Sequence, residues 1–207
     1  EKLISLQQYS NTIIVFTSDH GELLGSHGGM LQGWHQAYQE TIHVPLIIPS
    51  PLFQNEHHNV HSLTSHIDIL PTMLYLSGAN ADEIRLGLAS KFSLNLPLSG
   101  RNISHLIYGF YDKNTLYTSM EKYTKQRNRN YQDNSIYFYT EDNPTSGSNQ
   151  YVNCNKYNSV VQPSSIEAVL FSYRNKLWKL TYYYSPVNSC SNIAGSTYEL
   201  YNITNDP

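Results

Sequence analysis

The sequence predicts an α/β fold with a smaller antiparallel piece at its C-terminal end. Strand-like and helix-like segments alternate along the first half of the chain, whereas the end of the chain is rich in strand signals. The 207 residues suffice for one good hydrophobic core, or for one domain with a small appendage. No internal repeat interrupts this order.

The predicted elements of the first part follow each other closely: the end of a helix at 1–8, a buried strand at 12–16, a short helix at 37–41 and a second buried strand at 44–48. Pro49 ends that second strand, because proline lacks the N–H that a strand ladder needs. A polar linker at 54–63 precedes a helix at 67–76. Asp68 lies in its first turn, where the helix dipole favours a carboxylate, and Gly78 is typical of a helix stop.

The later elements are predicted to be less regular at first and then strand-rich. Three segments come first: a loop at 80–99, a short helix at 103–108 and a polar, weakly helical stretch at 113–133. Strands are then predicted at 135–140, 168–173 and 177–184, the last two forming a hairpin around the turn at 174–176. Residues 143–165, rich in Asn, Ser, Pro and Gly, are predicted to be a long surface excursion.

The composition excludes several classes of partner. A net charge of -3 and 14% charged residues indicate neither a nucleic-acid partner nor a membrane-surface partner. No apolar run reaches the roughly 18 residues that span a bilayer. Cys154 and Cys190 are too few for a disulfide framework, and one bridge and two free thiols are both open. The compartment is also open, although the low cysteine count favours the cytoplasm.

The run from Ile13 to Gly28 carries the strongest chemical signal. Four apolar residues lead into Asp19 and His20 at the carboxyl end of a predicted strand, where ligands bind in open α/β sheets. The pair offers one carboxylate oxygen and one imidazole nitrogen to a divalent cation. The alternative is a polar turn between strand and loop, and these residues alone do not decide between the two.

Longer runs follow in a fixed order: TSDHGELLGSHG at 17–28, HQAYQETIHVPLII at 35–48, SHIDILPTML at 65–74, GRNISHLI at 100–107, YFYTEDNP at 137–144, IEAV at 166–169, LWKL at 177–180 and ELYNITNDP at 199–207. Together they resemble the sulfatase family of the alkaline-phosphatase superfamily, in particular its arylsulfatase and phosphonate monoester hydrolase branch. The resemblance spans nearly the whole chain.

The resemblance implies the C-terminal part of an alkaline-phosphatase-like α/β sandwich. Residues 1–112 would form the C-terminal half of the catalytic domain, and residues 113–207 a smaller antiparallel subdomain. The chain begins without Met in a helix-like tail and stops at Pro207 in mid-motif by comparison with the family. We therefore expect it to be a portion of a longer protein.

The resemblance also implies a metal-dependent sulfuric ester hydrolase. Asp19 and His20 would be two of about four ligands to one divalent metal, with Ca²⁺ expected and Mn²⁺ or Mg²⁺ as alternatives. A formylglycine nucleophile and two more Asp ligands would belong to the missing N-terminal half, since neither Cys154 nor Cys190 lies in the required motif. The chain alone is therefore predicted not to hydrolyse a sulfate ester. His20, where many sulfatases have Asn, keeps phosphonate or phosphate esters as an alternative substrate.

Departures from the family pattern keep a further alternative open. His27 resembles a loop histidine that would bind a leaving-group or anionic oxygen; the alternative is a loop histidine that faces solvent or caps backbone groups. Gly33 stands where a Lys is expected, and a protonated His35 would be the group that replaces part of that charge. His43 stands where the family prefers Arg. These losses of charge support a non-catalytic fragment or a degraded copy that keeps the fold.

Other polar residues are predicted to have structural roles. Glu40 would support a loop through hydrogen bonds, and His66 and Asp68 would cap and pack the start of a helix. Three further histidines, which no carboxylate accompanies, are predicted to lie in a solvated linker: His57, His58 and His61.

Overall fold

The computed structural model describes residues 1–31, 33, 35–49, 59–79, 81–92, 98–108, 135–142, 163–185 and 196–205. The chain forms two compact units, each built from two separate stretches of sequence. Residues 1–12 and 50–133 form the first unit, and residues 13–49 and 134–207 form the second. The predicted domain boundary between residues 112 and 113 is a different division of the chain. That boundary follows from the resemblance to the family and stays a prediction.

The first unit is helical in its described residues. Its elements are α1 (Lys2–Ser5), η1 (Tyr9–Asn11), η2 (His66–Asp68), α4 (Ile69–Leu76), α5 (Ala81–Phe92) and α6 (Ser104–Tyr108). The predicted helices at 67–76 and 103–108 are confirmed, whereas the predicted loop at 80–99 is wrong because α5 occupies much of it. Seven of the twelve residues of α5 are Ala, Leu, Glu, Arg or Lys, which favour a helix even without a clear apolar stripe.

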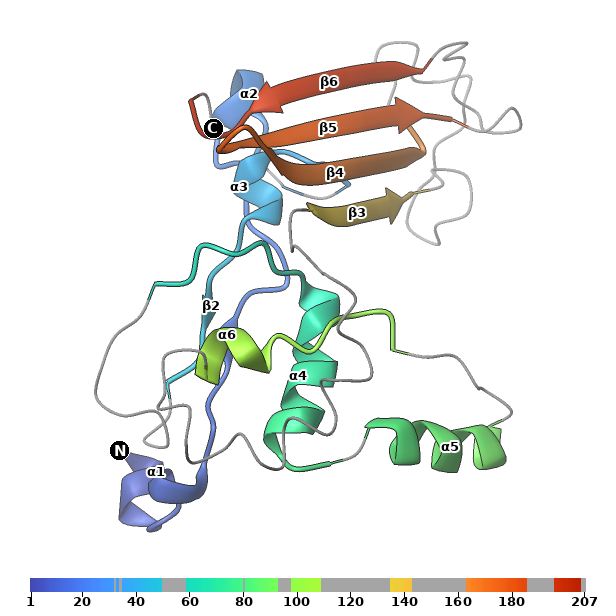
Figure 1. Ribbon diagram of the computed structural model, residues 1–207. Coiled ribbons are helices and arrows are strands. Elements are labelled where there is room, and N and C mark those ends of the chain that lie inside the picture. The colour runs from blue at the N-terminus through green and yellow to red at the C-terminus, as the bar shows by residue number, and fades with distance from the viewer. Residues whose placement is uncertain are drawn as a thin grey trace, which may run out of the picture. The chain divides into compact units, whose positions relative to one another are not determined.

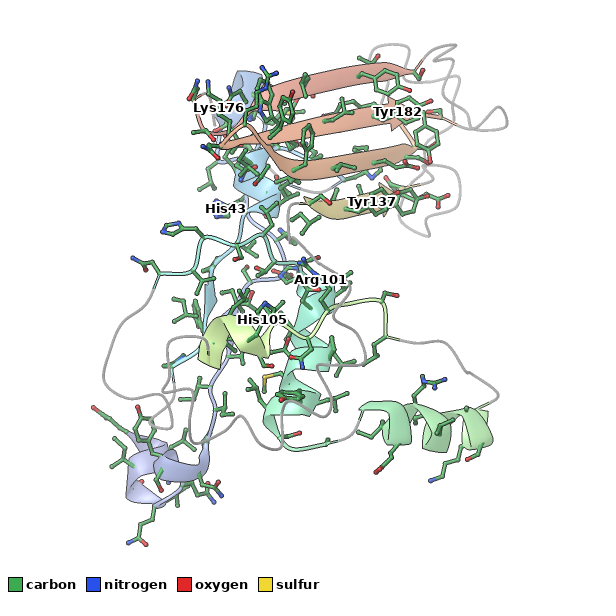
Figure 2. The ribbon with its side chains drawn as sticks, in the orientation of Figure 1. His43, Arg101, His105, Tyr137, Lys176 and Tyr182 are labelled. Atoms are coloured by element: carbon green, nitrogen blue, oxygen red, sulfur yellow. The ribbon has the colours of Figure 1, made fainter. Side chains whose placement is uncertain are left out.

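Asp68 organises the start of α4. Its side chain is only 1% exposed and accepts hydrogen bonds from the amides of Ser65 (2.9 Å) and Arg101 (2.7 Å) and from the Arg101 guanidinium (2.8 Å). Ser65 and Asp68 also form a capping box. The predicted capping and packing role of Asp68 is therefore confirmed. Arg101 lies beside the N-terminal end of α4 (Figure 2).

The second unit begins with a short two-stranded antiparallel sheet. Phe16 of β1 (Phe16–Thr17) pairs with Ile47 of β2 (Leu46–Ile47). The predicted strands at 12–16 and 44–48 are thus present but much shorter. They are also not buried, because Phe16 and Ile47 are 58% and 54% exposed. Among the described residues each strand pairs only with the other, so no further strand flanks them.

The larger sheet contains β3 (Ser135–Glu141), β4 (Ser165–Tyr173), β5 (Lys176–Tyr184) and β6 (Thr197–Asn202). The strands lie in sequence order and every pair is antiparallel (Figure 1). The predicted strands and the β4–β5 hairpin are confirmed. The predicted surface excursion is wrong at its end, because Ser164 and Ser165 are buried and Ser165 begins β4. β6 was not predicted, because its short alternation includes Glu and Asn.

The core of the second unit lies on one face of this sheet. Ala37 packs there against Ile166 and Ala168, and Phe138 and Tyr183 contact the same cluster. Successive residues of a strand point to opposite faces, so the other face carries a different set. Its members include exposed tyrosines and leucines: Tyr137, Tyr139, Leu180, Tyr198 and Leu200. The segment around Ala37 is therefore held against the inner face of the sheet.

Some predictions fall outside the described residues. These are the weakly helical stretch at 113–133, most of the excursion at 143–165, the two cysteines, and the histidines at positions 57 and 58. Across the described ranges, no helix is both long and apolar enough to cross a membrane. The short helices α2 (Ser26–Gly29) and α3 (Gln39–Ile42) of the second unit flank the candidate site.

Candidate functional site

Asp19 and His20 lie side by side in the loop after β1. The amide of His20 donates to Asp19 Oδ1 (2.9 Å), and the Ser18 hydroxyl donates to the carbonyl of His20 (2.8 Å). The ring of His20 donates from Nδ1 to the carbonyl of Gly21 (2.9 Å), so Nε2 is the nitrogen left to bind a ligand. That Nε2 lies 3.7 Å from Asp19 Oδ2. The loop therefore brings a carboxylate oxygen and an imidazole nitrogen within 3.7 Å of each other.

The electrostatics of this pair favour its charged form. The hydrogen bond from the His20 amide and the charge of the imidazole lower the pKa of Asp19. The hydrogen bond to the Gly21 carbonyl and the nearby Asp19 carboxylate raise the pKa of His20. A cation bound here would take the place of the proton on His20, so its affinity would increase with pH.

The geometry of the pair fits one divalent ion. Two donor atoms that each lie about 2.0–2.4 Å from a metal are about 3–4 Å apart, and the Asp19 oxygen and His20 nitrogen meet this condition. Asp19 is 85% exposed, so an ion can reach it without unfolding the loop. Within the described part of the chain, no group of three or more His, Cys, Asp or Glu side chains could hold a metal. The pair is thus at most part of a coordination shell.

Glu22 is a site neighbour to which the sequence analysis gave no role. One of its carboxylate oxygens lies 3.8 Å from Nδ1 of His20, and the other accepts the amide of Gly33 (2.8 Å). Gly33 itself has no space for a side chain. A Cβ there would lie 2.6 Å from the carbonyl oxygen of Gly21 and 2.8 Å from the Thr41 hydroxyl. The packing of this loop therefore requires glycine at position 33, where the family resemblance leads us to expect Lys.

His27 and Glu40 form a second polar pair. His27 donates from Nε2 to the Glu40 carboxylate (3.1 Å) and stacks on the Tyr38 ring, with ring centroids 3.8 Å apart. His27 has a left-handed backbone (φ 52°), which is uncommon for a residue with a side chain. A hydrogen bond of Glu40's own backbone and the bond from His27 lower the pKa of Glu40. Glu40 thus holds Nε2 of His27, and the Tyr38 ring holds the plane of the imidazole.

The two polar pairs are connected through the backbone of α3. The amide of Gly21 donates to the carbonyl of Thr41 (2.8 Å). A Cβ at Gly21 would collide with the carbonyl oxygen of Glu40, so the two backbones are in direct contact. The residue after the Asp19–His20 pair is therefore packed against the segment that carries Glu40.

His35 lies apart from these pairs. Its ring is buried, donates from Nε2 to the carbonyl of Pro163 (2.7 Å) and accepts from the Thr140 hydroxyl at Nδ1 (3.3 Å). Both ring nitrogens thus have hydrogen-bond partners. These contacts favour a structural role, in which His35 ties its segment to the β3–β4 end of the sheet.

Lys179 of β5 is a second residue that sequence reasoning did not single out. It is only 2% exposed, and its Nζ donates to the carbonyl of Ala37 (2.6 Å). The sequence gives only a weak signal that Lys179 is buried. Its position in the strand places it on one face of the sheet but does not indicate that this face is the buried one. The contact joins residues 142 positions apart in the sequence.

Comparison with known proteins supports the resemblance to the sulfatase family for the first part of the chain. Residues 1–79 match the family model described as Sulfatase. Over 81 residues the chain is 42% identical to the uncharacterized sulfatase YidJ of Escherichia coli (strain K12), covering 39% of this chain and 16% of that protein. Over 102 residues it is 35% identical to arylsulfatase K of Canis lupus familiaris, covering 48% of this chain and 18% of that protein.

A third relative is a putative extracellular sulfatase Sulf-1 homolog of Caenorhabditis elegans, 38% identical over 77 residues. That alignment covers 37% of this chain and 10% of the relative. The chain thus spans less than a fifth of the length of each of these three relatives. No solved structure matches it.

Proposed function

We propose that this chain, whose residues 1–79 belong to the sulfatase family, supplies half of the metal site of a sulfuric ester hydrolase. The supporting observation is the Asp19–His20 pair, whose Oδ2 and Nε2 atoms lie 3.7 Å apart at an exposed turn. The remaining metal ligands and a formylglycine nucleophile would come from outside residues 1–207.

The donor set suggests which metal is held. A carboxylate suits Mg²⁺, Ca²⁺ and Mn²⁺, whereas an imidazole suits softer transition metals. One donor of each kind makes Mn²⁺ a better candidate than Ca²⁺, whose protein ligands are oxygens. When bound, such an ion would neutralise charge on the oxygens of the ester and on the attacking group. Asp19 and His20 would hold it through side chains that local hydrogen bonds already orient.

His27 is proposed to contact the substrate. Its Nε2 is occupied by Glu40, which leaves Nδ1 as the nitrogen that can face a leaving-group or anionic oxygen. The Glu40 carboxylate would keep the proton of His27 on Nε2, and stacking on Tyr38 would fix the orientation of the His27 ring. These residues would bind and orient an ester oxygen and exchange a proton with it.

Sulfate monoesters are the proposed substrates, and phosphonate or phosphate esters the runner-up. A second candidate function is ester binding without turnover, in a copy that has lost activity. The packing of Gly33 favours this second candidate, because the loop has no space for the expected Lys beside the reacting ester. Loss of one such cationic contact would cost roughly 100-fold or more in rate.

The test uses the full-length protein and two chromogenic substrates, an aryl sulfate and an aryl phosphonate. Hydrolysis should stop with chelator and return when Mn²⁺ is added. Asp19→Asn and His20→Ala should each lower kcat/KM by about 100-fold or more, since each removes a metal ligand. His61→Ala, an exposed histidine of the first unit, is the matched control and should be unchanged.

The outcomes separate the candidates. Chelator-insensitive hydrolysis would exclude the metal role of Asp19 and His20. Faster cleavage of the aryl phosphonate would establish the runner-up substrate. No hydrolysis of either ester, together with Mn²⁺ binding that depends on Asp19, would support the candidate that binds without turnover.

A further inference from the structure

We infer that Lys179 is a positioning residue: its buried ammonium fixes the segment of residues 37–42, and that segment in turn fixes the loops carrying Asp19, His20 and His27. The consequence for catalysis rests on the proposed function, whereas the structural coupling does not. The sheet of β3–β6 would then be a support for the candidate site rather than an appendage.

The ammonium of Lys179 lies in an unusual place for a charged group. It is buried on the inner face of the sheet, where it donates to the carbonyl of Ala37 (2.6 Å) and lies 5.2 Å from the centroid of the Tyr201 ring. Burial lowers the pKa of Lys179, while the charges of Glu40 and Glu199 oppose this shift. A buried ammonium is costly unless it is hydrogen-bonded. An apolar side chain would serve packing alone, so the hydrogen bond to Ala37 is the specific contribution of this lysine.

The anchored carbonyl stands immediately before α3. Ala37 also packs its side chain into the core of the unit, against Ile166 and Ala168. The next residue, Tyr38, accepts the amides of Thr41 (3.0 Å) and Ile42 (3.1 Å) and so starts the helix. Lys179 therefore sets where α3 begins on the sheet.

From α3 the connection continues to both polar pairs. The carbonyl of Thr41 accepts the amide of Gly21, one residue after His20. The carboxylate of Glu40 binds the ring of His27. A displacement of α3 would move both contacts together, so a single anchor positions the candidate metal ligands and the candidate substrate histidine.

The experiment compares the 207-residue chain with its Lys179→Met variant. Met keeps the apolar stem but cannot donate to Ala37. Lys176→Met is the matched control, because Lys176 is exposed at the start of the same strand, while Tyr182 lies toward its other end (Figure 2). The measurements are amide hydrogen exchange and the NMR signals of the imidazoles, neither of which requires turnover.

In Lys179→Met we expect the amide of Gly21 to exchange at least about 10-fold faster, because its acceptor on α3 is no longer held in place. The imidazole signals of His20 and His27 should shift, while the amides of Ala168 and Leu170 in β4 keep their rates. The control should match the wild type. Unchanged Gly21 exchange and unchanged imidazole signals would overturn the inference, as would equally faster exchange throughout β3–β6, which indicates general destabilisation.

A measurement on the wild-type chain covers the case in which the variant does not fold. The Nζ protons of Lys179 should exchange slowly with water and give an NMR signal that exposed lysines such as Lys176 lack. Absence of such a signal would overturn the inference. If the full-length protein hydrolyses an ester, Lys179→Met should lower kcat by about 10-fold or more with little change in KM. Failure to hydrolyse any ester would count against the proposed function only.

Discussion

Two buried charged residues, Asp68 and Lys179, are satisfied in different ways. Asp68 meets the Arg101 guanidinium and two backbone amides, whereas Lys179 donates to a backbone carbonyl and faces an aromatic ring. Each holds together segments that are distant in sequence. Burial without these partners would be strongly unfavourable for either charge, so both positions should be sensitive to substitution.

Asp68→Asn should lower the free energy of unfolding of the first unit by about 3 kcal/mol, because it leaves the Arg101 guanidinium without its buried counter-charge. Chemical denaturation followed by circular dichroism measures this loss. His66→Ala, an exposed neighbour in η2, is the control and should cost much less. A loss below about 1 kcal/mol for Asp68→Asn would contradict the central role given to this carboxylate.

The same residue predicts how stability depends on pH. Burial alone would raise the pKa of Asp68, but the hydrogen bonds from Arg101 and Ser65 outweigh it and hold the pKa below 3.8. A carboxyl with a lowered pKa in the folded state stabilises the fold fully above its unfolded pKa, and this contribution is lost as pH falls through the folded pKa. The difference in unfolding free energy between the wild type and Asp68→Asn should therefore decrease below about pH 4. Chemical denaturation at pH values from about 2 to 7 measures this difference. A constant difference over this range would exclude the linkage.

Glu40→Gln tests the pairing with His27. The variant keeps the shape of the side chain but removes the charge that orients the imidazole, so kcat/KM of the full-length enzyme should fall by about 10-fold to 100-fold. The measurement is steady-state hydrolysis of the better of the two chromogenic esters. Glu141→Gln, on the outer face of β3, is the control and should retain full activity.

Among the elements, the β4–β5 hairpin shows a local conflict between sequence and conformation. Its turn residues Arg174 and Asn175 both have left-handed backbones (φ 51° and 59°), as a two-residue hairpin turn requires. Asn adopts this conformation readily, whereas Arg does so at a cost of about 1 kcal/mol. The guanidinium of Arg174 recovers part of that cost by lying 5.1 Å from the centroid of the Tyr173 ring.

Arg174→Asn should therefore stabilise the second unit by about 0.5 kcal/mol, since relief of the backbone cost exceeds the loss of an exposed cation–π contact of about 0.5 kcal/mol. Thermal unfolding followed by circular dichroism should show a small increase in Tm. Lys176→Asn, next to the turn but outside it, should not increase Tm. A lower Tm for Arg174→Asn would mean that the Tyr173 contact is the dominant effect.

The elements that the sequence predicted well are those with a strong local pattern. β3, β4 and β5 are rich in β-branched and aromatic residues, and this local signal needs no knowledge of distant contacts. β1 and β2 were predicted as longer, buried strands because an apolar run alone does not reveal how many strands will flank it. α5 was missed because helix propensity without an apolar stripe is a weak signal.

The same distinction applies to the candidate site. Asp19 and His20 are adjacent in the sequence, so their proximity is local and predictable. The contacts of Lys179 with Ala37 and of His35 with Pro163 span more than a hundred residues, and no local pattern encodes them. The burial of His35 against β3 and β4 depends on the tertiary fold, so its sequence neighbours could not indicate it.

On the scale of the whole molecule, the chain crosses between two compact units after residues 12, 49 and 133. Each unit has its own buried residues, with Thr72 and Ile103 in the first and Ile166 and Ala168 in the second. Units with separate cores can unfold in separate steps. Stability measured for the complete chain would then combine two contributions.

Calorimetry should resolve two transitions. Ile166→Ala, which removes a side chain that is almost fully buried, should lower only the transition of the second unit, by about 3 kcal/mol in unfolding free energy. Asp68→Asn should lower only the other transition. A single transition that both variants shift equally would show instead that the units unfold as one.

The close contact between the Gly21 and Glu40 backbones affects how mutational scans of this protein should be read. Positions 21 and 33 would each reject every other amino acid, because a Cβ at either would meet backbone or side-chain atoms. In a selection for activity they would rank beside Asp19 and His20 although neither has a side chain that can react. Intolerance to substitution alone would thus not separate positions required for packing from positions required for catalysis. Measuring folding separately from turnover would distinguish the two kinds of position.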